Sequence, residues 1–296
     1  MSLKANVQNE GIYLQLLEQI QKIYKHNRQG SYKTKERYYE ATKRFCMYLA
    51  DQYCLQKFEN VKSKHLISYT AYMQQKETAA ATIKTDLAAI RFYHDQSGSK
   101  NNLVTNEALN LEKRKVRGIN RAWTQEEFER FQAICTKLGK TRIKEMALVA
   151  MELGFRIHEV ARIDKATVEQ ALRNNMITIK GKGGKIRNVE LTSKTRELFE
   201  SKLKEVERGA KIFVNKDEKT DEVINKVQEF IIYTRHRWQE PAAEVDKTFH
   251  GLRHTYARKQ YEQLRKAGEN EQIARKEVSR NLGHNRIEVT KIYTEE

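Results

Sequence analysis

The sequence predicts a mainly helical (mainly α, α+β) fold, in which a helical N-terminal domain precedes a second, mostly helical domain with a small antiparallel β-sheet. Two observations predict the helices. The 296 residues include one proline and 13 glycines, so helices meet few breakers, and apolar residues recur at helical spacing along much of the chain. The sheet is predicted by one stretch that alternates in strand fashion on both sides of a glycine-rich turn. A hydrophobic content of 39% over this length suffices for two domains, each with its own core.

The N-terminal half of the chain has the pattern of four amphipathic helices. Apolar residues keep helical spacing over residues 11–24 and 33–53. Two further helices are expected to begin at Ser63 and Thr82. We therefore assign residues 8–112 to a helical domain.

Residues 113–122 are predicted to form a basic linker. From Glu112 to Arg121 the sequence has a basic residue at nearly every second position and no regular apolar face. Such a segment is either a solvated connector or a strap across a phosphate backbone, and its position between two basic domains favours the strap.

The second domain, residues 123–296, is predicted to open with a helix. Thr124 offers an N-cap oxygen, and Glu127 completes a capping box three residues later. Helices should follow through Lys140 and over residues 142–153.

A β-hairpin is predicted next in this domain. Residues 176–180 and 187–191 alternate in strand fashion around a turn at residues 181–184, of which three are glycine. From Thr192 onward the pattern returns to helix. The short apolar segment 212–214 is expected to be either a strand or a buried link.

The charge of the chain points to a polyanionic partner. A formal net charge of +17 is best explained by nucleic acid, and a membrane is disfavoured because no run approaches 18 apolar residues and no cleavable apolar leader is present. Three cysteines, Cys46, Cys54 and Cys135, have no metal-ligand spacing and fit a reducing compartment. We expect a soluble, cytoplasmic protein without a metal site.

Four segments in the second half carry polar residues suited to phosphoryl transfer without a metal. In chain order they are Gly154-Phe155-Arg156-Ile157-His158-Glu159, Gly181-Lys182-Gly183, His250-Gly251-Leu252-Arg253-His254 and Leu282-Gly283-His284, the last followed nine residues later by Tyr293. Singly, each has an ordinary explanation: a surface ion pair, a solvated hairpin tip, a histidine pair that could suggest zinc but lacks further ligands nearby, and a packing tyrosine. Their joint occurrence in this order favours a catalytic site.

These segments resemble the catalytic boxes of the tyrosine recombinase, or phage integrase, family. The first is similar to the family's Gly-Leu-Arg-x-x-Glu box, and the turn continues into its Gly-Lys-Gly-x-Lys-x-Arg pattern, which ends at Arg187. The others match its His-x-x-Arg box and its Leu-Gly-His to tyrosine segment. Residues 82–93 resemble the last helix of the family's core-binding domain. The resemblance thus implies a DNA core-binding domain at 8–112 and a catalytic domain at 123–296.

The resemblance also implies a mechanism. Tyr293 would attack a DNA phosphodiester to give a 3′-phosphotyrosyl link and a free 5′-hydroxyl, which conserves the bond energy without ATP. Arg156 and Arg253 would hold the non-bridging oxygens, where charge gathers in the transition state, with their planar forks.

Four further residues complete the implied site. Lys182 would protonate the departing 5′-oxygen, His250 would help to accept the tyrosine proton, and His284 would hydrogen-bond the phosphate. Glu159 would support them by orienting Arg156 or His250. No metal and no cofactor is called for.

Double-stranded DNA is the expected partner, clasped between the two domains. Candidate DNA contacts are Lys84, Arg91, Lys113, Arg114, Lys115, Arg117, Lys185 and Arg187. The family resemblance implies self-assembly to a tetramer on DNA. Because the chain ends three residues beyond Tyr293, we expect a monomer in free solution.

The expected function is that of a bacterial site-specific DNA recombinase, or integrase, that integrates or excises a mobile element at the nucleoid. Two alternatives stay open: relaxation of DNA in the manner of a type IB topoisomerase, and a catalytically inactive DNA-binding accessory protein. Relaxation of supercoiled DNA, strand exchange between attachment sites, or neither would distinguish the three.

Overall fold

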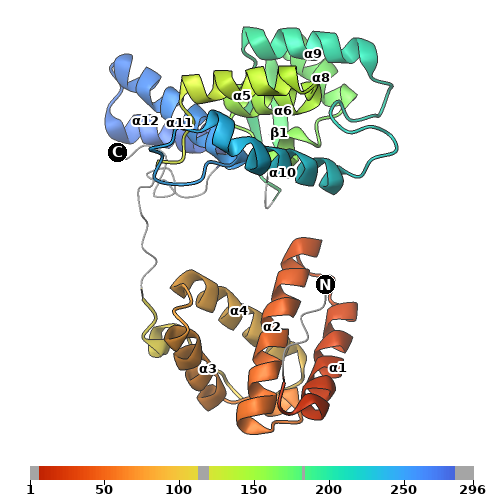
Figure 1. Cartoon of the computed structure of the whole chain (residues 1–296), viewed down its shortest axis with the longest axis vertical. Coiled ribbons are helices and arrows are strands. Elements are labelled where there is room, and N and C mark those ends of the chain that lie inside the picture. The colour runs from red at the N-terminus through yellow and green to blue at the C-terminus, as the bar shows by residue number, and fades with distance from the viewer. Residues whose placement is uncertain (1–6, 113–119, 182–183, 284–296) are drawn as a thin grey trace. The chain divides into compact units, whose positions relative to one another are not determined.

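A computed structural model describes residues 7–112, 120–181 and 184–283 of the chain (Figure 1). Its contacts divide the chain into two units, residues 1–115 and 116–296, and each unit is described by itself. The described residues form twelve α-helices and one two-stranded antiparallel sheet. The predicted mainly α fold with a small sheet is therefore confirmed.

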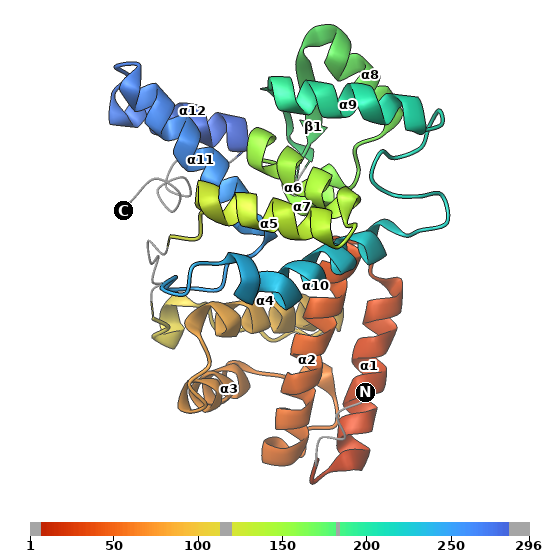
Figure 2. The ribbon, with the colours of Figure 1, turned by 45° about the horizontal axis from the view of Figure 1, so that its top comes forward.

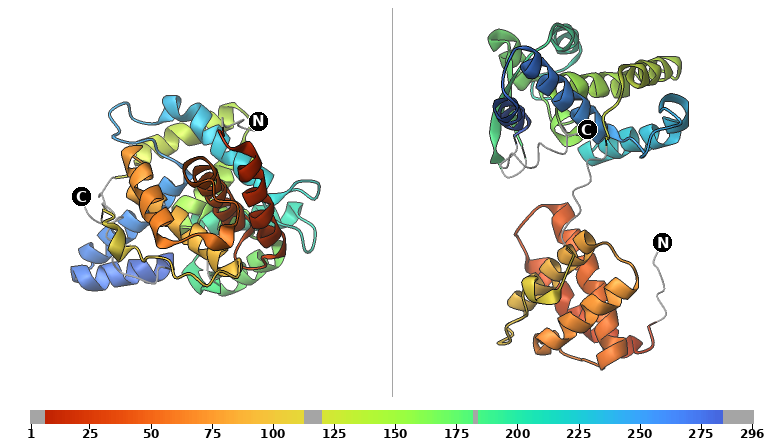
Figure 3. Two further views of the ribbon diagram at one scale, coloured as in Figure 1. Left: turned by 90° about the horizontal axis from the view of Figure 1, so that it is seen from below. Right: turned by 90° about the vertical axis from the view of Figure 1, so that its left-hand side faces the viewer.

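The first unit is a small helical bundle, seen from two further sides in Figure 3. Helix α2 packs against α1, α3 and α4, and α3 also contacts α4. The helices are α1 (Glu10–His26), α2 (Tyr32–Tyr53), α3 (Ser63–Gln75) and α4 (Ala80–Gln96), with short 3₁₀ helices η1 (Phe58–Asn60) and η2 (Glu107–Leu109).

Local sequence explains the bounds of the longest helix in this bundle. Ser31 caps α2 by accepting a hydrogen bond from the Thr34 amide, and the C-cap residue that follows the helix is Cys54, whose φ of 47° is left-handed. Inside the bundle, the rings of Phe45 and Tyr69 meet edge to face with centroids 5.0 Å apart. The four predicted helices are thus present and share one apolar core.

The second unit contains the remaining elements, most of which are labelled in Figure 2. Helix α6 is central, since it contacts α5, α9 and α11. The elements are α5 (Gln125–Lys137), α6 (Thr141–Leu153), α7 (Ile157–Val160), α8 (Lys165–Asn174), β1 (Met176–Lys180), β2 (Ile186–Glu190), α9 (Ser193–Glu205), α10 (Thr220–Trp238), α11 (Phe249–Lys266) and α12 (Glu271–Leu282).

The start of the second unit is fixed by a capping box and by stacked aromatic rings. The Thr124 side chain accepts from the Glu127 amide, and the Glu127 carboxylate accepts from the Thr124 amide. Just before this helix, the Trp123 ring stacks on that of Trp238 with centroids 3.9 Å apart. The predicted capping box is confirmed, and α10 is tied to the start of the unit.

The predicted hairpin is present, with its second strand beginning one residue earlier than expected. Ile179 of β1 is paired with Arg187 of β2, and the buried positions alternate with exposed ones along both strands. The segment 212–214 is a buried link, not a strand of this sheet; the Ile212 amide donates to the Ile163 carbonyl. Helix α8 is an element that the sequence pattern did not lead us to expect.

None of the helices in the part of the chain that the structure describes combines the length and the apolar character needed to cross a membrane.

Candidate active site

Arg156 is presented by a break between two helices. Gly154 ends α6 with a φ of +67°, and a Cβ there would lie 2.4 Å from Cδ1 of Tyr256. Only glycine tolerates both the left-handed backbone and this close approach. The chain then turns, and Arg156 becomes the N-cap residue of the short helix α7. The glycine of the first box thus sets the position of its arginine.

Glu159 is the buried centre of the site, with a side chain only 1% exposed. Its Oε2 accepts from the Arg156 amide at 2.8 Å, and its Oε1 accepts from Arg156 Nη1 at 3.0 Å. Arg187 Nη1 and Nη2 donate to Oε1 and Oε2 at 3.1 and 2.7 Å. Burial alone would raise the pKa of Glu159, but hydrogen bonds and charge from Arg187, and then from Arg156, outweigh it and lower the pKa to about 2. Glu159 is therefore ionised at neutral pH.

Arg253 lies on α11 and is fully buried. Its Nη1 donates to the Gly154 carbonyl at 2.5 Å, and its Nη2 donates to the Leu282 carbonyl. Carbonyls at helix ends carry partial negative charge, so a guanidinium is well suited to bind two of them. Arg253 thus joins the ends of α6 and α12 next to the Arg156 box.

His250 lies one turn before Arg253 on the same helix and reaches the surface. Its pKa is lowered to about 4, first because the ring is partly shielded from solvent and then by the positive charges of Arg253 and Arg156. The imidazole is therefore neutral at pH 7 and can accept a proton. Its ring centroid lies 5.3 Å from that of the buried His254.

A cavity of about 420 Å³ opens beside these side chains. Arg156 and His250 both line it, so a guanidinium and an imidazole face the same opening. The full lining is Arg156, Ile157, His158, Gln228, Ile231, Ile232, Thr248, Phe249 and His250.

The structure brings together four of the predicted site residues: Arg156, Glu159, His250 and Arg253. The other three, Lys182, His284 and Tyr293, lie outside the described residues. Among the described residues, no three histidine, cysteine or acidic side chains gather as a metal site would require.

The predicted DNA contacts differ in their surroundings. Lys84 Nζ donates to the Glu112 carbonyl, and the Arg91 guanidinium donates to the Val104 carbonyl and to Asn106 Oδ1. Lys185 is exposed on the hairpin. Lys113, Arg114, Lys115 and Arg117 lie outside the described residues.

Arg187 differs from Lys84, Arg91 and Lys185, the other predicted DNA contacts that the structure describes, because it is buried against Glu159. The alternation of the strand carries a signal of this burial. Arg187 is two residues from the buried Val189 and is paired with the buried Ile179, so it shares the inner face of the hairpin. A basic residue in phase with apolar ones indicates a buried partner.

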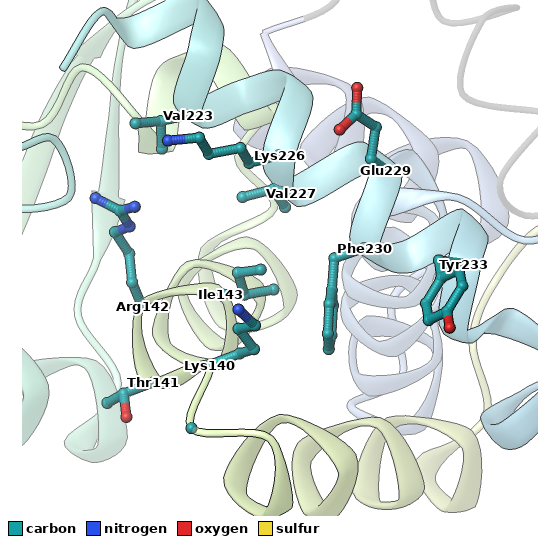
Figure 4. A pocket seen from close by; sticks show the side chains of 11 residues that line it. Lys140, Thr141, Arg142, Ile143, Val223, Lys226, Val227, Glu229, Phe230 and Tyr233 are labelled. Atoms are coloured by element: carbon teal, nitrogen blue, oxygen red, sulfur yellow. The ribbon is translucent and has the colours of Figure 1, made fainter.

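A larger cavity, of about 650 Å³, lies elsewhere in the unit between α10 and the start of α6 (Figure 4). Phe230 and Tyr233 extend from α10 on one side of it, and Lys140 and Ile143 lie opposite. Of the predicted catalytic residues that the structure describes, none lines this larger cavity, whereas Arg156 and His250 line the smaller one.

Comparison with protein families matches both units. Residues 121–296 match the model of the phage integrase family, and residues 14–103 match that of the phage integrase N-terminal domain. A search of curated protein sequences gave no significant match.

Solved structures share this fold at low sequence identity. The chain is similar to a lambda integrase tetramer bound to a Holliday junction, with a TM-score of 0.66, 17% identity and coverage of 98% of this chain and 78% of that one. It is also similar to the Tn1549 transposon integrase in complex with transposon right end DNA, with a TM-score of 0.63, 14% identity and 95% of each chain covered.

A third similar structure is the XerH site-specific recombinase bound to a palindromic substrate, in a post-cleavage complex. The TM-score is 0.63 at 18% identity, and the alignment covers 95% of this chain and 81% of that one. The family model covers more than half of the sequence, including every box from which the resemblance was drawn. The chain therefore belongs to the phage integrase family of tyrosine-type, site-specific DNA recombinases.

Proposed function

We propose that this chain breaks and rejoins double-stranded DNA at specific sites through a 3′-phosphotyrosyl link to Tyr293, and that it thereby integrates or excises a mobile element. The observation that carries the proposal is the cavity lined by both Arg156 and His250, with the buried Arg253 one turn from His250 on α11. Cations and a neutral base next to one opening are what an attack on a phosphodiester needs.

The charges at the site support this chemistry. Attack on phosphorus gathers negative charge on the non-bridging oxygens, which Arg156 can meet at the cavity with its planar guanidinium. The neutral imidazole of His250 can take the proton from the attacking hydroxyl. In this proposal Lys182 protonates the departing 5′-oxygen and His284 hydrogen-bonds the phosphate.

Arg253 needs a change of partner to take part. Both terminal nitrogens of its guanidinium donate to carbonyls, and the side chain is fully buried. We propose that the contact with the Leu282 carbonyl, at the end of α12, opens when DNA binds and that Arg253 then joins Arg156 on the phosphate. A phosphate oxygen is a stronger acceptor than a neutral carbonyl, which favours the exchange.

The proposed partner is duplex DNA, and the proposed active form is a tetramer assembled on it in a bacterial cell. The net charge of +17 supports DNA binding through phosphate contacts. Support for the assembly comes by analogy with the lambda integrase, which forms a tetramer on a Holliday junction.

A covalent-trapping assay tests the proposal. Nicked duplexes that carry candidate attachment sites would be incubated with the protein, so that a cleaved strand diffuses away and the adduct is trapped. We expect a protein–DNA adduct with wild-type protein and with Tyr261→Phe, a control on α11, but none with Tyr293→Phe. An adduct with Tyr293→Phe would overturn the assignment. Relaxation of supercoiled plasmid without strand exchange would instead indicate the topoisomerase-like activity.

A further inference from the structure

Arg187 is a buried cation whose environment differs from that of its neighbours in the strand. Its side chain is 5% exposed, whereas the adjacent Ile186 is 65% exposed. The strand therefore turns an arginine inward and an isoleucine outward, the reverse of what burial of apolar surface would favour. Such a placement requires a specific partner inside the protein.

The first partner of Arg187 is the box around Arg156. Both terminal nitrogens bind the carboxylate of Glu159, and the guanidinium lies over the Phe155 ring, 5.2 Å from its centroid. Arg187 thus contacts the residue just before Arg156 and the carboxylate that holds Arg156. Among the described residues, Nη1 is the one guanidinium nitrogen of Arg156 that hydrogen-bonds, and it does so to this carboxylate.

Two other segments of the site lie against the same side chain. A Cβ on Gly181 would be 3.2 Å from Arg187 Nη1, and a Cβ on Gly283 would be 3.3 Å from Arg187 Cδ. Gly181 directly precedes Lys182, and Gly283 directly precedes His284. Both glycines let the backbone approach Arg187 where a side chain would press against it.

We propose that Arg187 is a positioning residue of the recombinase, which holds the Arg156 box, the base of the hairpin and the end of α12 in a fixed mutual arrangement. This inference rests on the proposed function, because the three segments matter for DNA cleavage only if Arg156, Lys182 and His284 act on the phosphate. Arg187 itself is buried and does not touch the DNA.

The physical basis is the division of one carboxylate between two arginines. Arg187 donates to both oxygens of Glu159 in a fork, which fixes the plane of the carboxylate. Arg156 then meets an acceptor of fixed direction, so its guanidinium is held at the cavity. Without Arg187 the carboxylate keeps only its contacts with the amide and side chain of Arg156, so its plane is less fixed and Arg156 is held less firmly.

The alternative is that Arg187 only stabilises the fold. Lys247 and Glu127 provide a matched control, since they form a second buried pair in the same unit, with side chains 8% and 0% exposed. Glu127, like Glu159, is the capping-box glutamate of a helix. Lys247→Met should therefore cost stability much as Arg187→Met does, while leaving the contacts of Glu159 with Arg156 and Arg187 in place.

The decisive comparison is between Arg187→Met and Lys247→Met. At saturating nicked duplex, we expect the rate of adduct formation by Arg187→Met to fall about 10- to 100-fold while the Kd for DNA changes less than about threefold. Lys247→Met should keep the rate within about threefold at a similar loss of Tm. Arg187→Lys should recover the rate only in part, because the fork is lost. In a Glu159→Gln background, Arg187→Met should lower the rate no further.

Equal rates for Arg187→Met and Lys247→Met, or a loss in Kd with no loss in rate, would overturn the inference. A measurement that needs no DNA accompanies the assay: ¹³C NMR titration of the Glu159 carboxyl. The charged groups around it are Arg156 of the α7 N-cap and Arg187 of β2, with the titratable His158 and His250 close by. Its pKa should rise in Arg187→Met, and an unchanged pKa would also count against the inference. If wild-type protein forms no adduct, the proposed function fails while this titration still decides whether Arg187 controls the carboxylate.

Discussion

Two glutamates of the second unit occupy the same local motif but differ in function. Glu127 and Glu159 each stand at the third position of a helix, accept from the backbone amide of the N-cap residue at 2.8 Å, and are buried against a basic side chain. The cation is Lys247 for Glu127 and Arg187 for Glu159. Local sequence alone would class both as capping boxes.

The difference lies in the N-cap residue. At Glu127 it is Thr124, whose hydroxyl completes the box, and a backbone amide, that of Glu240, occupies the other carboxylate oxygen. At Glu159 it is Arg156, whose side chain extends to a cavity and carries a second positive charge. When the N-cap residue is an arginine and not a threonine, the same capping motif thus places a positive charge at the cavity.

The largest expected effect separates the two glutamates by activity. Glu159→Gln removes the charge that holds two arginines, so we expect adduct formation to slow on the order of 100-fold or more. Glu127→Gln should leave the rate of the folded protein within about threefold, although it lowers Tm. Single-turnover kinetics at saturating DNA would measure both, and similar rates in the two variants would remove the functional distinction.

The loss of folding stability in acid provides the second distinction between Glu159 and Glu127. Because the pKa of Glu159 is lowered to about 2, its contribution to stability is fully present above the pKa of an unfolded glutamate and is lost as the pH falls towards 2. Between pH 5 and 3 this loss should amount to about 2 kcal/mol. The pKa of Glu218 is also lowered to about 2, so some loss should remain in Glu159→Gln. Urea unfolding at the two pH values should therefore show a loss that is smaller by about this amount in Glu159→Gln than in wild-type protein and in Glu127→Gln. An equal loss in all three would assign it to other carboxylates.

Most of the helices, the hairpin, and Arg156 and His250 at the cavity could be predicted from the sequence, because each depends on short-range spacing. Arg156 with Glu159 and His250 with Arg253 are three residues apart, which a helical turn brings together. The burial of Arg253 against the carbonyls of Gly154 and Leu282 could not be read this way, since it depends on how three helices meet.

The role of Arg187 could also not be predicted from the sequence motif to which it belongs. Its box ends in a basic residue, which suggested a phosphate contact. The partner that draws it inward, Glu159, is 28 residues away in sequence, and only the packing of α7 on the hairpin brings the two together. Strand alternation could have indicated its burial, but not which acid it meets.

The pKa of His250 tests the electrostatics at the cavity that His250 and Arg156 line. Since the pKa of His250 is lowered to about 4, the imidazole should stay neutral down to about pH 5 in the free protein. The positive neighbours that contribute are Arg253, Arg156 and Arg121, and Glu159 opposes them. ¹⁵N NMR should show a higher pKa in Arg156→Gln, because one repelling charge is gone. A pKa near 6.5 in wild-type protein would contradict the proposed environment.

The smallest expected effect is on the salt dependence of DNA binding. It compares Arg187 of β2 with Lys185, which directly precedes this strand. Each phosphate contact releases about one counterion, so the slope of log K against log salt counts the contacts. Lys185 is exposed on the hairpin, and Lys185→Met should reduce the slope by about one unit if it meets a phosphate. Arg187 already has its carboxylate partner inside the protein, and Arg187→Met should leave the slope unchanged. Fluorescence anisotropy with duplex DNA at several salt concentrations would measure both. A reduced slope for Arg187→Met would mean that this arginine leaves Glu159 when DNA binds, and the distinction between an inward and an outward basic residue on this hairpin would no longer hold.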